Sequence, residues 1–127
     1  MLFEIKEDIH LEDLQKLQPA MWVVLTSVIM YCKKHNLPCR ITSIISDRDN
    51  VNAVSKTHDT GRAVDISIRG WRDIDCHRLC HKLQQDFSDI AAISYSDRRP
   101  RLALLKHDHI HLQVRPSANV LDKFETI

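Results

Sequence analysis

The chain lacks several features that would place it in a particular class of protein. Its 127 residues include only two glycines, Gly61 and Gly70, and 18 basic side chains nearly balance 17 acidic ones. This charge balance, with no basic run or interleaved aromatics, argues against a nucleic-acid-binding surface. The longest apolar stretch, residues 21–32, is too short to span a membrane. The first ten residues are charged, so the sequence predicts no secretory leader and synthesis in the cytoplasm.

The four cysteines do not require a disulfide framework. Without a leader, Cys32, Cys39, Cys76 and Cys80 are interpreted as reduced core residues. Cys76 and Cys80 alternate with histidines in "CHRLCH", but on a helix they share the apolar face, which favours core packing over a second metal site. No repeats or linkers divide the chain. Residues 1–127 are therefore predicted to form one domain, acting as a monomer.

Hydrophobic periodicity predicts an α+β protein. The central helix should begin at Pro19 and bury an apolar face that includes Trp22, and Asp73 is a candidate N-cap for the last long helix. We expect a small, mostly antiparallel sheet with helices packed on one face. The predicted helices cover residues 11–17, 19–35 and 73–87, with a short one after Pro116; the predicted strands cover 39–46, 62–68, 90–96, 101–106 and 109–115, with a hairpin turn at 97–100.

Two stretches carry candidate metal ligands. "SKTHDTGRAVDI" holds His58 in a predicted long loop and Asp65 in the strand that follows, seven residues later. Seven residues of extended chain span roughly 23 Å, too far for two ligands of one ion. The loop must therefore fold back, and Gly61 can supply a backbone angle open to few other residues. By itself this pattern is also compatible with a solvated histidine and an unrelated aspartate.

The second stretch, "KHDHIHLQV", favours the metal site over the solvated histidine. Three histidines and Asp108 lie within five residues at the start of a predicted strand. Such a cluster is hard to explain as a solvated surface. Because side chains alternate along a strand, His109 and His111 share one face. One of them could bind a metal while the other acts beside it.

Together, "S-x-x-H-D-T-G-R-A-V-D-I" and "D-H-I-H-L" resemble the zinc peptidases of the D-alanyl-D-alanine carboxypeptidase family. That family includes vancomycin-resistance D,D-dipeptidases and phage L-alanyl-D-glutamate endolysins, and a wider group adds lysostaphin-type and hedgehog-type zinc domains. The resemblance implies a hedgehog/D-Ala-D-Ala peptidase-like fold. It also implies a Zn²⁺ ion bound by His58, Asp65 and His111.

The same resemblance implies the catalytic residues. Asp108, three residues before the last ligand, matches the family's general base, and Arg48 matches an arginine that steadies the substrate or the oxyanion. The serine of the motif stands three residues before His58, where the family usually has two. A regular strand would turn Asp108 away from His111, so either the strand begins after Asp108 or a bulge redirects it. Asp108 is the favoured base, with His109 as its accessory or alternative.

The resemblance implies a zinc-dependent hydrolase of peptidoglycan stem peptides that cuts a D-Ala-D-Ala or an L-Ala-D-Glu bond. A phage endolysin of this kind would reach the cell wall after a membrane lesion. The alternatives are a cytoplasmic D,D-dipeptidase, a non-catalytic hedgehog-like zinc-binding module, and an immunity or assembly protein. A purely structural zinc site needs neither a base nor an oxyanion partner. Asp108, His109 and Arg48 therefore favour the enzyme.

Overall fold

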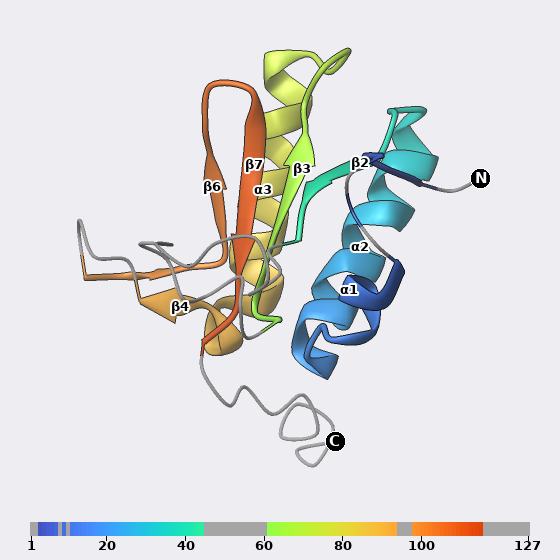
Figure 1. The fold of residues 1–127 in the computed structure, drawn as a ribbon. Helices are drawn as coiled ribbons and strands as arrows, with labels where there is room; N and C mark the ends of the chain where they lie inside the picture. The colour runs from blue at the N-terminus through green and yellow to red at the C-terminus, as the bar shows by residue number, and fades with distance from the viewer. Residues whose placement is uncertain (1–2, 8, 10, 45–60, 94–97, 116–127) are drawn as a thin grey trace.

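The computed structural model describes residues 3–7, 9, 11–44, 61–93 and 98–115 (Figure 1). Predicted features at residues 45–60 and 116–127, including the long loop and the last short helix, lie outside this part of the chain. Three α-helices, one 3-10 helix (Ser88–Ile90) and seven short strands are formed within it.

The larger sheet has five strands in the order β1-β2-β3-β7-β6. β1 pairs with β2 in parallel, and every other neighbouring pair is antiparallel. The α+β class and the mostly antiparallel sheet are therefore confirmed. The strands are β1 (Glu4–Ile5), β2 (Arg40–Ser43), β3 (Ala63–Ser67), β6 (Ala103–Leu105) and β7 (His109–Gln113).

The central helix α2 (Pro19–His35) has the predicted bounds and follows the short helix α1 (Leu11–Gln15). Proline in its first turn needs no amide hydrogen bond, and the helix ends at Asn36 in the left-handed conformation. One side of it is buried in the core, whereas Trp22 and Met30 remain 36% and 53% exposed. The prediction of a buried Trp22 was wrong, because Met21, Val24 and Leu25 occupy the inward side of this turn and are fully buried.

The second long helix, α3 (Asp73–Phe87), also has the predicted bounds, but its start differs from the prediction. Arg72 is the N-cap residue, without a side-chain cap, and Asp73 is the first helical residue. The Arg72 guanidinium instead binds the buried Asp75 carboxylate through two contacts of 3.0 and 3.2 Å. This hydrogen-bonded cation lowers the pKa of Asp75. A carboxylate in the first turn also suits the positive end of the helix dipole.

The two faces of the large sheet differ in character. Along β3 and β7, alternate residues Val64, Ile66, Ile110 and Leu112 are buried in a core that also contains α2 and α3 side chains. In Figure 1, α3 lies behind β3 and β7. The residues between them point to the opposite face. That face carries partly exposed polar side chains, namely Asp65, Ser67, His109, His111 and Gln113.

The predicted hairpin near residues 97–100 is present in shorter form. β4 (Ala92–Ile93) pairs with β5 (Pro100–Arg101) in a separate two-stranded sheet. The chain then continues into β6, which pairs with β7. Residues 94–97 of the predicted strand lie outside the described chain. β2 ends at Ser43, whereas the predicted strand ended at Ser46. Ser46 also lies outside the described chain.

Gly61 fixes how the chain enters β3. Its φ is +71°, in the left-handed region, and a Cβ atom there would overlap the carbonyl oxygen of Lys16. The Gly61 carbonyl accepts a hydrogen bond of 3.0 Å from the Gln18 amide, between α1 and α2. Both the backbone angle and the close approach require glycine. This tie anchors the start of the strand that carries Asp65.

All four cysteines are free thiols, and three of them, Cys32, Cys39 and Cys76, are buried. Cys80 is half-buried and packs against the core. Their interpretation as core residues is confirmed. Within the described residues, no helix combines the length and apolar character needed to cross a membrane.

Candidate functional site

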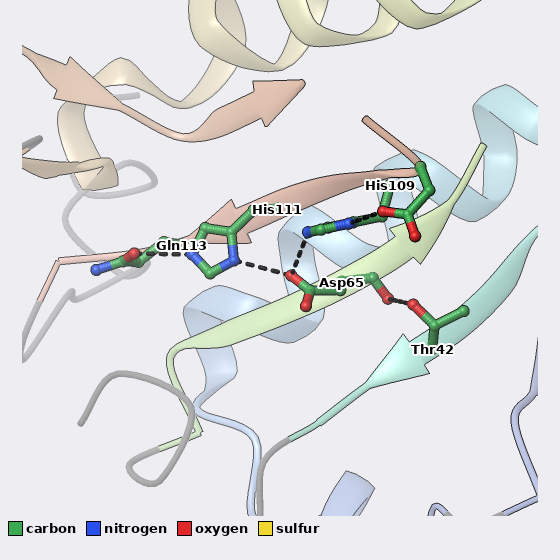
Figure 2. A network of polar contacts seen from close by, with 6 residues as sticks. Thr42, Asp65, His109, His111 and Gln113 are labelled. Carbon is green, nitrogen blue, oxygen red and sulfur yellow. Dashed lines mark hydrogen bonds and ion pairs between the residues drawn. The ribbon is translucent and has the colours of Figure 1, made fainter. Parts of the chain in front are cut away.

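Two of the predicted metal ligands face each other across neighbouring strands. In the β3–β7 ladder Asp65 is directly opposite His111. The Asp65 Oδ1 atom lies 2.8 Å from His111 Nδ1, although the residues are 46 positions apart in the sequence. Their side chains are only 17% and 16% exposed. Figure 2 shows the pair at the centre of a line of polar side chains on this face of the sheet.

The second ring nitrogen of His111 is held by Gln113. His111 Nε2 donates to Gln113 Oε1 at 2.9 Å. In a neutral imidazole this leaves a lone pair on Nδ1, facing the Asp65 carboxylate. A short contact between two such acceptors is favourable only when a cation, either a proton or a metal ion, lies between them. The pair is therefore arranged to hold a positive charge.

The pKa of His111 agrees with this arrangement. Burial by itself lowers it, but the hydrogen bonds to Asp65 and Gln113, together with the Asp65 charge, outweigh burial and raise it. In the absence of a metal, the raised pKa favours a proton on the ring as the source of the positive charge.

The donor set also fits zinc. Imidazole nitrogen and carboxylate oxygen are common zinc ligands, and two ligand atoms of a tetrahedral site lie about 3.3 Å apart. The 2.8 Å contact between Asp65 and His111 would need to widen by only about 0.5 Å to reach that separation. Within the described residues, no group of three or more histidine, cysteine or acidic side chains is placed to hold a metal. The predicted third ligand, His58, and the predicted substrate arginine, Arg48, lie outside them.

His109 lies on the same face and connects Asp108 to this pair. Its Nδ1 atom is 2.7 Å from Asp108 Oδ1, and its Nε2 atom is 3.8 Å from Asp65 Oδ1. β7 begins at His109, so the strand does start after Asp108, as one of the two predicted alternatives required. The Asp108 side chain is 79% exposed and contacts His109 rather than His111. The hydrogen bond with His109 is the main cause that lowers the pKa of Asp108.

Sequence reasoning missed two members of this network. Gln113 orients His111, and the Thr42 hydroxyl donates a 3.4 Å hydrogen bond to the Asp65 backbone carbonyl. Gln113 follows His109 and His111 at two-residue spacing, and that alternation was the available signal for it. Thr42 belongs to another strand, and nothing in the local pattern links it to Asp65.

Comparisons of the chain with protein-family models, with curated proteins and with solved structures find no match. The motif residues and the geometry of the site are therefore the observations that bear on function.

Proposed function

We propose that the chain is a zinc peptidase that hydrolyses peptidoglycan stem peptides at a D-Ala-D-Ala or an L-Ala-D-Glu bond. Together with this function we propose that the α+β fold is of the hedgehog/D-Ala-D-Ala peptidase-like type. The observation that supports the proposal most is the 2.8 Å contact between Asp65 and His111. These are two of the three residues that the motif resemblance assigns to zinc, and they meet on the polar face of the sheet.

Asp65 and His111 would hold the ion together with His58, the third motif residue. Bound zinc would supply a Lewis acid that polarises the scissile carbonyl and lowers the pKa of the attacking water. Gln113 keeps the His111 ring in the orientation that turns Nδ1 toward Asp65. Ligand orientation by such an outer hydrogen bond is general in metal sites.

We assign the proton transfer to His109, with Asp108 as its positioning residue. The sequence favoured Asp108 as the base, but the Asp108 carboxylate contacts the His109 ring, whose other nitrogen faces Asp65. A carboxylate on Nδ1 orients an imidazole so that Nε2 can take a proton from water and return it to the leaving amine. This division of labour makes His109 the more critical of the two residues.

His109→Ala should lower kcat by about a thousandfold, within the range of lost general acid–base catalysis. Asp108→Asn should lower kcat by only about tenfold and leave KM unchanged, because His109 is still present. The double variant should be no slower than His109→Ala alone, since residues acting through one another are not additive. Steady-state kinetics on a synthetic stem peptide measures all three. If Asp108→Asn is as slow as His109→Ala, or if the two losses multiply, this assignment is wrong.

The function itself is tested by digesting purified peptidoglycan with the zinc-loaded protein and identifying new termini by mass spectrometry. We expect new stem-peptide ends with the wild type and none with His109→Ala. His81→Ala, which removes an exposed histidine of α3, is the matched control and should cut normally. Bound zinc without any new terminus would refute the peptidase. The non-catalytic zinc-binding module would then replace it.

Gln113→Leu should weaken zinc binding by roughly ten- to a hundredfold, the usual effect of losing a hydrogen bond to a ligating histidine. Leucine has a similar size, but it leaves His111 Nε2 without its acceptor. Competition with a chromogenic zinc chelator measures the affinity, and Gln85→Leu on the exposed side of α3 is the matched control. Equal affinity of Gln113→Leu and the wild type would show that Gln113 does not support the site.

A further inference from the structure

A cleft lies beside His109. Its volume is about 620 Å³, and it is lined by both residues of the His109–Asp108 pair. Arg40, Thr42 and Ser67, which also line it, come from the ends of β2 and β3 nearest to His109. Small-molecule sites typically occupy a few hundred to a thousand cubic ångströms. The cleft is therefore large enough for one or two amino-acid residues of a peptide bound next to the proposed reacting groups.

The lining of this cleft is rich in cations. Lys6, Arg40 and Arg69 contribute three basic side chains, and His107 adds an imidazole. The carboxylate in the lining, that of Asp108, is hydrogen-bonded to His109. The charge of the cleft thus favours an anionic ligand.

The two arginines line the cleft together with the His109–Asp108 pair. Arg40 begins β2 and Arg69 follows the end of β3, and both also line an adjoining cavity of about 270 Å³. Glu4 lines this second cavity, but not the larger cleft. Two guanidinium groups at one end of a polar cleft can bind a carboxylate through paired hydrogen bonds.

We propose that Arg40 and Arg69 form a carboxylate subsite, which binds a free α-carboxylate of a D-amino acid on the substrate. The inference rests on the proposed peptidase function and adds the residues that position its substrate. A stem peptide offers this group in two places, at the C-terminal D-alanine and at the D-glutamyl residue. Holding either one beside His109 would align the neighbouring peptide bond with the proposed reacting groups. The source of the carboxylate therefore determines which bond is cut.

Nuclear magnetic resonance titration of the zinc-loaded protein tests the subsite without any need for turnover. The probes are N-acetyl-D-alanine and N-acetyl-D-glutamine, each compared with its α-carboxamide. We expect the favoured acid to bind about tenfold more tightly than its amide, as for a hydrogen bond to a charged group. Preference for the alanine probe identifies the C-terminal source, and preference for the glutamine probe identifies the D-glutamyl source.

Arg40→Gln and Arg69→Gln should each reduce the acid-to-amide ratio to near one. Arg78→Gln, which removes the same charge from an exposed position of α3, should leave it unchanged. Amides that bind as tightly as acids, or a ratio that survives both substitutions, would overturn the subsite. Kinetic measurements distinguish a failure of the carboxylate subsite from a failure of the proposed peptidase function. Stem-peptide cleavage with a KM unaffected by either substitution refutes the subsite and leaves the peptidase, whereas carboxylate binding without any cleavage supports the subsite and refutes the peptidase.

Discussion

Asp65→Asn should abolish most of the peptidase activity while the protein remains folded. The amide has the same shape but lacks the negative charge that balances a cation beside His111. A Lewis-acid contribution of several kcal/mol corresponds to roughly a thousandfold in rate, so kcat should fall by about that factor. Zinc affinity should fall by more than about a hundredfold, beyond the effect typical of outer-shell changes. The Thr42 hydrogen bond is made to the Asp65 backbone, so the substitution leaves it in place.

The measurements are steady-state kinetics on a stem peptide and zinc competition, with circular dichroism to check the fold. Asp73→Asn, an exposed carboxylate at the start of α3, is the matched control and should behave as the wild type does. If Asp65→Asn keeps wild-type zinc affinity, the metal is not at the β3–β7 pair. If it binds zinc weakly but cuts the peptide at the normal rate, the hydrolysis does not depend on this site.

Gly61→Ala should destabilise the protein by about 3 kcal/mol. The left-handed backbone alone costs an alanine about 1–2 kcal/mol, and the added Cβ would also overlap the Lys16 carbonyl. The strand can avoid this overlap only by moving away from the α1–α2 turn, which would break the Gln18–Gly61 hydrogen bond. Urea unfolding of the metal-free proteins measures the loss.

Gly70→Ala is the matched comparison, because Gly70 also has a left-handed backbone but an added Cβ there would overlap no other atom. Its φ is +86°, but the nearest atom to an added Cβ is the Pro38 Cγ at 3.6 Å, an ordinary contact. This variant should lose only about 1–2 kcal/mol. Equal losses at the two glycines would show that the close approach at Gly61 adds nothing to stability.

Local sequence patterns predicted the long helices well, because each has a sustained apolar periodicity over many turns. The bounds of α2 and α3 agree with the prediction. The start of α3 differed from the prediction: Arg72, and not Asp73, is the N-cap residue, and its guanidinium binds Asp75. Trp22 was wrongly predicted to be buried, because α2 has more apolar residues than its buried side can accommodate.

The site was predictable only in part, because local patterns do not specify which strands pair. Asp65 and His111 face each other only when β3 pairs with β7 in one particular register. Only the motif resemblance suggested that these two residues meet. The role of Asp108 depended on where β7 begins. The ladder between β3 and β7 ends at the pair Ser67–His109, and the Asp108 carbonyl then accepts a bond from the Ile68 amide. A single register thus sets His109, and not Asp108, beside Asp65.

The most direct test of the account is a zinc titration of the metal-stripped protein, with peptide hydrolysis and bound zinc measured at each step. We expect a rate that rises in proportion to bound zinc and levels off at one ion per chain. Asp65→Asn should show neither tight zinc binding nor the zinc-dependent peptide hydrolysis. Tight binding of one zinc per chain with no hydrolysis at any step would contradict the account, and so would hydrolysis that persists in the metal-free protein.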